Sequence, residues 1–169
     1  ADLPHVVQAW DVLQDKVTTG KRVVIIGGGA VGVETALFLA EKGTLSPEAL
    51  KFLIVNRAED FEDLYELATL GTKKIVVIEM IDKMGKDIGK TTRWGILQDL
   101  ARKGIETRVT TTALEITATC VAAEVDGKPE EIPADTVVLA AGAPIEVVVA
   151  PGADLACQLV PAELLPHAQ

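Results

Sequence analysis

A chain of 169 residues with 49% hydrophobic and 4% aromatic side chains has the size of one domain and the composition of a core made of Val, Ile, Leu and Ala. The formal net charge is −9, and no cluster of Lys and Arg is visible, which argues against nucleic acid as a partner because phosphate contacts need clustered positive charge. No signal-peptide pattern and no uncharged apolar run of membrane-spanning length is visible, so a cytoplasmic protein without a membrane partner is expected.

The first part of the chain predicts a short helix, a strand and a longer helix. Residues 9–13 predict the short helix, inside a lead-in segment that covers residues 1–20. Residues 22–26 are branched and apolar and predict a buried strand. Residues 30–42 predict a helix that ends at Gly43, the residue type that most easily adopts the left-handed conformation after a helix.

Residues 44–73 admit two interpretations. Ser46 and Pro47 make a good helix start, and Asp60 begins a second one, so two short helices are expected. The apolar run 52–55 is also compatible with a strand.

The second half of the chain alternates strands and helices before a run of short strands. The expected elements are a strand at 74–79, a helix at 90–103, a strand at 105–109, three meander strands at 113–118, 119–125 and 130–132, and a strand at 136–141. Asp126-Gly127 is a hairpin signal between two of the meander strands. The alternation favours a parallel sheet with helices on both sides. The fold class is therefore α/β, a Rossmann-like three-layer domain with a parallel sheet, helices and a small antiparallel β-meander, followed by an irregular tail at 145–169.

A glycine-rich turn joins the strand at 22–26 to the helix that follows. Gly27 permits the tight turn, Gly29 lets the backbone approach a pyrophosphate, and Gly32 lets the helix pack close to the strand. Ala30 and Val31 begin the helix, where free N–H groups and the helix dipole favour phosphates. This turn predicts a dinucleotide ligand.

The residue that reads the ribose of the dinucleotide has two candidates. An acid at the end of the second strand normally lies about 20 residues after the glycines. If residues 44–73 are an insertion, Glu79 takes the ribose hydroxyls and NAD is preferred. If 52–55 is the second strand, Arg57 can bind a 2′-phosphate and NADP is preferred. Spacing alone leaves both alternatives open.

Several stretches of the sequence together resemble a known family. They are Gly-Gly-Gly-Ala-Val-Gly-Val-Glu (27–34), Val-Val-Ile-Glu-Met (76–80), Asp-Ile-Gly (87–89) and Asp-Thr-Val-Val-Leu-Ala-Ala-Gly-Ala-Pro (135–144), with 9–13 and 44–48 as further matches. Over residues 5–144 the chain resembles the pyridine-nucleotide domain of the flavin-linked disulfide-reductase-like superfamily. More closely, it is similar to the NAD(P)H region of 2-enoate reductases, in the group with 2,4-dienoyl-CoA reductase and trimethylamine dehydrogenase.

The resemblance assigns roles to individual residues. It favours the insertion and hence Glu79 as the ribose reader, with the three glycines at the pyrophosphate. It implies that Glu34 orients the nicotinamide ring; the alternative is a first-turn acid that only interacts with the helix dipole. It implies that the cofactor passes close to Ala141 and Gly142; the alternative is a glycine that merely ends the strand.

The resemblance also implies what surrounds the domain at 21–144. NAD(H), favoured over NADP(H), would pass hydride to a flavin held by another domain, and FAD, FMN, an iron–sulfur cluster and a barrel domain would belong only to the parent protein. The chain has none of these parts, so it is expected to be an excised domain that is inactive alone. Relatives usually carry Gly-x-x-Pro-Asn after the last strand, and this chain has Gly142-Ala143-Pro144 instead, so no function is assigned beyond that point. Two alternatives remain: a site for the ADP half of FAD, and a non-catalytic docking module.

The remaining reactive residue types do not form a recognisable site. Cys120 and Cys157 show no C-x-x-C spacing, and His5 and His167 stand in the two terminal segments, so neither a metal site nor a catalytic residue is expected. Packing roles are expected for Cys120, Cys157, Trp10 and Trp94.

Overall fold

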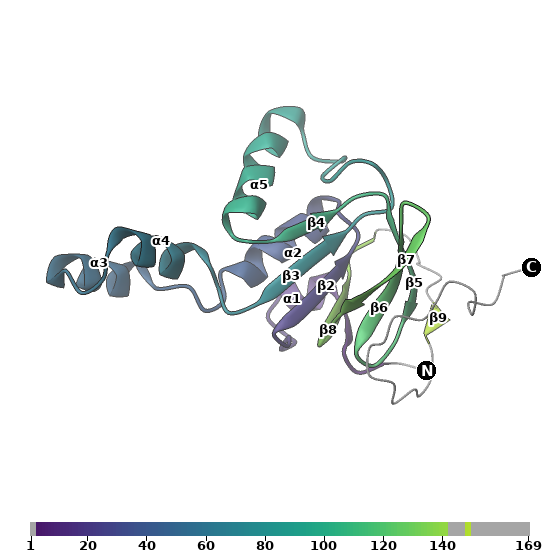
Figure 1. Cartoon of the computed structure of the whole chain (residues 1–169), viewed down its shortest axis with the longest axis horizontal. Helices are drawn as coiled ribbons and strands as arrows, with labels where there is room; N and C mark the ends of the chain where they lie inside the picture. The colour runs from purple at the N-terminus through teal and green to yellow at the C-terminus, as the bar shows by residue number, and fades with distance from the viewer. Residues whose placement is uncertain (1–2, 142–147, 150–169) are drawn as a thin grey trace, which may run out of the picture.

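The computed structural model describes residues 3–141 and 148–149, which form two sheets and five helices (Figure 1). The strands are β1 (Val6–Gln8), β2 (Arg22–Ile26), β3 (Lys74–Ile78), β4 (Glu106–Arg108), β5 (Thr111–Ile116), β6 (Cys120–Val125), β7 (Lys128–Pro133), β8 (Thr136–Leu139) and β9 (Val148–Val149). The helices are α1 (Ala9–Leu13), α2 (Ala30–Ala40), α3 (Pro47–Asn56), α4 (Phe61–Thr69) and α5 (Lys90–Arg102). In this described part, no helix combines the length and the hydrophobicity needed to cross a membrane.

The larger sheet is parallel and has the strand order β1-β8-β2-β3-β4. Strand β2 lies at its centre, where Val24 pairs with Val76 on one side and with Val137 on the other. Four of the five residues of β2 are buried, as expected for a strand covered on both faces. The connection from β2 to β3 contains α2, α3 and α4, and this crossover lets the two strands run in the same direction.

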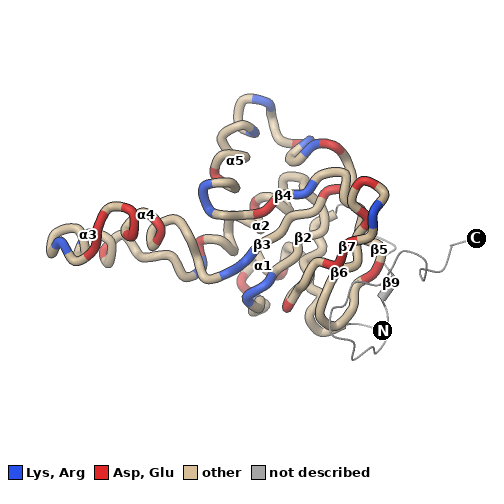
Figure 2. The backbone as a smooth tube through the Cα atoms, viewed as in Figure 1, with Lys and Arg blue, Asp and Glu red and all other residues tan. Residues whose placement is uncertain are grey.

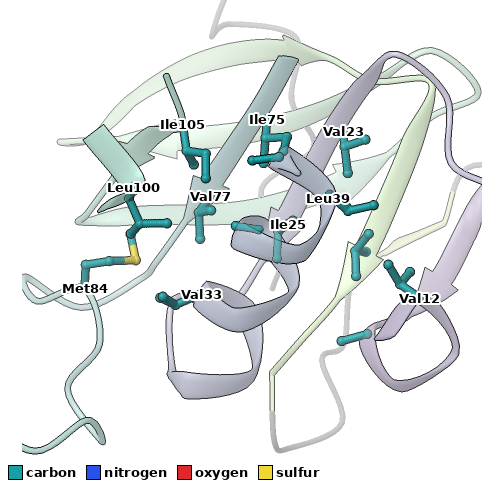
Figure 3. Close-up of a cluster of buried hydrophobic side chains, with 14 residues drawn as sticks. Val12, Val23, Ile25, Val33, Leu39, Ile75, Val77, Met84, Leu100 and Ile105 are labelled. Atoms are coloured by element: carbon teal, nitrogen blue, oxygen red, sulfur yellow. The ribbon is translucent and has the colours of Figure 1, made fainter. Parts of the chain in front are cut away.

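One face of the parallel sheet packs against helices α1, α2 and α5 (Figure 3). Ile25 of β2 and Val77 of β3 are fully buried on this face. Val33 and Leu39 of α2 lie over them, and Leu100 of α5 extends the same cluster. Burying a side chain of this size contributes about 1.5–3 kcal/mol to the stability of the fold, so this cluster holds α2 firmly against the sheet.

The other face of the parallel sheet is covered by the antiparallel strands. Val24 and Val137 of the large sheet pack with Ile116, Val121 and buried residues of the strands β5 to β7. The small sheet has the order β7-β6-β5-β9. The prediction of helices on both sides of the sheet is therefore wrong within the described residues, because the meander buries the face that a second helix layer would cover. The three-layer α/β architecture itself is confirmed.

The segment at 44–73 forms two helices, α3 and α4, as expected. Ser46 caps α3 by accepting a hydrogen bond from the Ala49 N–H, and Asp60 caps α4 in the same way. The alternative that residues 52–55 form the second strand is wrong, because they lie inside α3. The local capping signals decided this competition, since an apolar run of four residues fits either a helix or a strand.

The two helices form a hairpin that projects away from the sheets at the left of Figure 1. Neither helix contains a buried residue. Its exposed apolar side chains are Phe52, Ile54, Val55, Phe61, Tyr65 and Leu67. Figure 2 shows acidic residues along α4, whereas Lys and Arg are spread over the described chain.

Three local features differ from expectation. Strand β1, in the expected lead-in segment, pairs with β8 in the parallel sheet; a strand of three residues is too short to show a pattern. Strand β9, within the expected irregular tail, pairs with β5.

Trp10 and Trp94 are 62% and 63% exposed, so the prediction that they are packing anchors is wrong, whereas Cys120 is buried as expected. Cys157 lies outside the described residues.

An ion pair fastens β2 to the chain just before β8. The Asp135 carboxylate accepts hydrogen bonds from the Arg22 backbone N–H at 2.8 Å and from the Arg22 Nε at 3.0 Å. The side-chain hydrogen bond from Arg22, followed by the backbone one, lowers the pKa of Asp135 from 3.8 to about 2. A carboxylate whose pKa is lowered by folding stabilises the folded chain at pH values above the pKa that the group has in the unfolded chain. This stabilisation is lost as the pH falls through the folded-state pKa.

Asp135→Asn is therefore expected to lower the free energy of unfolding at pH 7 by about 1 kcal/mol, a modest value because the pair is partly exposed to solvent. In the wild type the same contribution should disappear between about pH 4 and pH 2, and the variant should lack that step. Urea unfolding measured from pH 6 to pH 2 checks this, with Asp82→Asn as a control for the change in charge. Parallel pH curves for the wild type and Asp135→Asn would contradict it.

Candidate functional site

A cavity of about 370 Å³ lies at the carboxyl ends of the parallel strands. Its position follows from the strand order, since β3 lies on one side of β2 and β8 on the other. In open α/β sheets, ligands bind at such a point, where the connections leave in opposite directions. The lining residues are Ile26, Gly27, Gly29, Ala30, Val31, Ile78, Glu79, Met80, Asp87, Thr111, Thr112, Ala113, Ala140 and Ala141.

The glycine turn forms the floor of this cavity. Gly27 has a φ of +110°, a conformation that side chains disfavour, and a Cβ there would lie 2.9 Å from the Ala141 backbone nitrogen. A Cβ at Gly32 would lie 1.9 Å from the Gly27 carbonyl oxygen, so helix α2 can pack this closely only with glycine at that position. The turn is thus shaped by close approach of backbone to backbone.

Gly28 is also required, although the sequence pattern treats its position as variable. A Cβ there would lie 2.3 Å from the Met84 sulfur and 2.9 Å from the Glu79 Cβ. Its N–H donates a hydrogen bond of 2.7 Å to Glu79 Oε2, and its carbonyl oxygen accepts one of 2.7 Å from the Gly85 N–H. This role is not visible in the sequence because Met84 and Gly85 follow Gly28 by more than 50 positions.

Glu79 follows β3 directly, and its carboxylate faces the glycine turn. Besides the bond from Gly28, its Oε1 accepts a hydrogen bond of 3.2 Å from the Ile81 N–H. A carboxylate offers about four acceptor positions, so two of them stay open. Because Glu79 also lines the cavity, it can hold the turn in shape and still accept hydrogen bonds from a ligand.

The first turn of helix α2 lines the cavity with Ala30 and Val31. Its N-cap residue is Gly29, which has no side chain to cap the helix. The Ala30 N–H instead donates to both oxygens of Asp87, at 2.9 and 3.1 Å. Asp87 belongs to a stretch that carried the family resemblance, but it was not among the predicted site residues.

The wall opposite the glycine turn comes from the antiparallel sheet. Thr111, Thr112 and Ala113 of β5 line it. The Thr111 N–H donates to the Glu79 carbonyl oxygen at 2.9 Å, which joins β5 to the end of β3. Sequence spacing gives no signal for this wall, because it depends on where the small sheet packs.

The structure brings most of the predicted site residues together. Those that line the cavity are Gly27, Gly29, Ala30, Val31 and Glu79. Gly32 lies under the turn, and Glu34 is exposed on α2 and does not line the cavity. Gly142 lies outside the described residues. Among the residues that the structure describes, no group of three or more His, Cys, Asp or Glu is placed to hold a metal ion.

Arg57, the alternative reader of a 2′-phosphate, does not belong to this site. It ends helix α3 in the left-handed conformation and is exposed at the projecting hairpin. Its role depended on residues 52–55 being the strand next to β2 after the glycine turn, and β3 is that strand instead.

Proteins similar to this chain include reductases and an NADH oxidase. The chain is 50% identical over 137 residues to a metal reductase from Desulforamulus reducens, matching 81% of this chain and 20% of that protein. It is 35% identical over 140 residues to an NADH oxidase from Thermoanaerobacter brockii, matching 81% of this chain and 17% of that protein. A solved 2-naphthoyl-CoA reductase complex shares the fold with a TM-score of 0.61 and 23% identity, over 82% of this chain and 17% of that one.

The chain therefore spans about a fifth of the length of the relatives that it matches. Residues 3–160 match the family described as pyridine nucleotide-disulphide oxidoreductase, whose members bind FAD and NAD(P)H. The match covers most of the chain and includes the glycine turn, Glu79 and both sheets. The chain belongs to the pyridine nucleotide-disulphide oxidoreductase family.

Proposed function

We propose that the chain is an NAD(H)-binding domain of a larger flavin-dependent reductase and that the cavity at the glycine turn holds the dinucleotide. The observation that carries the proposal is the pairing of the Gly27–Gly32 turn with the Glu79 carboxylate in one cavity. Bound NADH would supply hydride for a flavin held by another domain. This chain's own residues bind and orient the dinucleotide.

The site fits the pyrophosphate of a dinucleotide. Gly29 has no side chain between the turn and the cavity, and the atoms nearest to a Cβ there would be those of the flexible Asp87 carboxylate. The Ala30 N–H already holds an anion, because Asp87 accepts its hydrogen bond. A helix N-terminus that takes a carboxylate offers the same N–H and the same positive dipole end to a phosphate.

The site favours NAD over NADP. The open acceptor positions of Glu79 suit the two hydroxyls of an adenosine ribose. A 2′-phosphate would instead bring negative charge against this carboxylate. Among the described lining residues there is no Lys or Arg to offset that repulsion. The relative named NADH oxidase is consistent with this preference.

The proposal extends to the domain limits and to the parent protein. Residues 21–144 form the NAD(H)-binding domain with the insert at 44–73. Glu34, exposed on α2, is the candidate for orienting the nicotinamide ring. The parent is an enoate-reductase-like flavoenzyme. A relative named cinnamate reductase, 53% identical over 38 residues, supports the last point. The exposed apolar side chains of the α3–α4 hairpin are consistent with contacts to other domains of the parent.

A nucleotide titration of the purified 169-residue chain tests the proposal. NADH is expected to bind with a lower dissociation constant than NADPH, measured by calorimetry or by quenching of tryptophan fluorescence. Binding of neither nucleotide below millimolar concentration would contradict the proposal. A purified chain that is yellow, with the absorbance of bound flavin, would replace it with a site for the ADP half of FAD.

Gly29→Ala separates binding from folding. The atoms nearest to the new Cβ would be those of the flexible Asp87 carboxylate, at 3.1 Å or more, and Gly29 has an ordinary φ of −72°, so stability should change by less than about 1 kcal/mol. The Cβ would hold the pyrophosphate away from the turn, and NADH affinity should fall by at least about tenfold. Urea unfolding and the same titration check both parts. Unchanged NADH affinity in a folded variant would place the pyrophosphate elsewhere.

A further inference from the structure

The amide at the start of helix α2 already has an anionic partner within the chain. Asp87 reaches the Ala30 nitrogen with Oδ1 at 2.9 Å and Oδ2 at 3.1 Å. Because the N-cap residue Gly29 lacks a side chain, this carboxylate supplies the cap that a Ser or Asp would supply at that position. Asp87 therefore caps α2 from 57 positions further along the chain.

The same amide faces the cavity that the proposed function assigns to the pyrophosphate. Gly29, Ala30 and Asp87 all line this cavity. One N–H group makes one good hydrogen bond, so a phosphate oxygen and the Asp87 carboxylate compete for it. The two anions would also repel each other at this distance. A phosphate bound at the Ala30 N–H and the observed position of Asp87 are therefore mutually exclusive.

The loop between β3 and α5 holds Asp87 in a way that lets its side chain leave. Met84 is buried, and the Gly85 N–H donates to the Gly28 carbonyl oxygen. Ile88 packs against the core on the helical face of the sheet. Asp87 itself is exposed, so its carboxylate can turn into water while these anchors stay in place.

We infer that Asp87 is an internal competitor of the dinucleotide: it occupies the Ala30 N–H in the ligand-free chain and is displaced when a phosphate of the ligand binds. The inference rests on the proposed function. Only molecules in which Asp87 has left the amide can bind, so the apparent affinity is the intrinsic affinity multiplied by the fraction of molecules in which the cap is open. A capping contact of ordinary strength corresponds to a reduction of about fivefold.

Titration of NADH into the full 169-residue chain tests the inference with three variants. Asp87→Ala is expected to bind NADH about fivefold more tightly than the wild type. Asp87→Asn should be intermediate, because Asn can still accept the Ala30 hydrogen bond but carries no charge. Asp82→Ala is the control: Asp82 is exposed in the same loop and its loss changes the net charge equally, so the affinity should stay within about twofold of the wild type.

Two further measurements assign the gain to the phosphates. ADP should show the same gain as NADH in Asp87→Ala, whereas adenosine, which has no phosphate, should show none. In the ligand-free chain, the Ala30 amide proton should exchange with solvent faster in Asp87→Ala than in Asp82→Ala. Urea unfolding identifies a variant that is not folded, and Asp87→Asn, which keeps an acceptor for Ala30, then carries the test.

The outcomes separate the two proposals. If the wild type binds NADH and neither Asp87 variant binds it more tightly, the inference is wrong and the proposed function stands. A gain of equal size in Asp82→Ala, or with adenosine, also overturns the inference, because it would reflect net charge or loop packing. If neither the wild type nor any variant binds NADH or ADP, the proposed function fails and the inference falls with it.

Discussion

Gly32→Ala is expected to lower the free energy of unfolding by about 3 kcal/mol or more, a large part of the stability of an ordinary domain. The new Cβ would lie 1.9 Å from the Gly27 carbonyl oxygen, which is backbone and cannot turn aside. Relief requires helix α2 to move away from β2, and α2 carries Val33 and Leu39 into the core. Urea unfolding followed by circular dichroism measures the loss.

A second glycine gives the matched control. Gly95 lies inside helix α5, and a Cβ there would meet nothing within 4 Å. Gly95→Ala should therefore raise stability by about 0.5–1 kcal/mol, since alanine is the better helix former. The same substitution should thus have opposite signs in the two helices. Equal effects at Gly32 and Gly95 would mean that α2 does not pack on the turn as described.

Glu79→Ala is expected to have the second largest effect and to act on both stability and binding. It leaves the N–H groups of Gly28 and Ile81 without their carboxylate partner, and a lost charge-assisted hydrogen bond costs about 2 kcal/mol. It also removes the proposed acceptor of the ribose hydroxyls, so NADH affinity should fall by at least about tenfold. Unfolding and nucleotide titration measure the two effects.

Glu79→Gln separates the two effects. The amide oxygen can still accept the Gly28 hydrogen bond, so most of the stability should return, while the negative charge that disfavours a 2′-phosphate is gone. The preference for NADH over NADPH should then shrink. Glu66→Gln on α4 is an exposed control for the charge, and Arg57→Ala should leave the affinity for both nucleotides unchanged. A loss of NADPH affinity in Arg57→Ala would contradict the assignment of β3 as the strand that reads the ribose.

Much of the fold was predictable because its signals are local. The branched run of β2, the glycine turn and the Asp126-Gly127 hairpin each act through neighbouring residues, and each lies where the sequence predicts it. The two helices of the insert also follow from local caps at Ser46 and Asp60. Strand β1 could not be predicted, since its three residues are too few to show a pattern and form a strand only by pairing with β8.

The layer arrangement depended on contacts that the sequence does not show. Alternating strands and helices predict a parallel sheet, and helices usually cover both of its faces. Here Ile116 and Val121 of the meander bury one of those faces. Trp10 and Trp94 were expected in the core because tryptophan is large and apolar, yet both side chains are exposed in the folded chain.

The sequence by itself determined that a strand, a glycine turn and a helix form a dinucleotide-binding motif, because this motif works through the backbone of adjacent residues. Only the tertiary structure decided that Glu79, rather than Arg57, stands beside it, since β3 pairs with β2 and thereby brings the Glu79 carboxylate to the Gly28 N–H. It also decided that Gly28 must be glycine and that Asp87 caps α2. These roles come from residues more than 50 positions apart that meet at one sheet edge, and sequence spacing carries no information on such contacts.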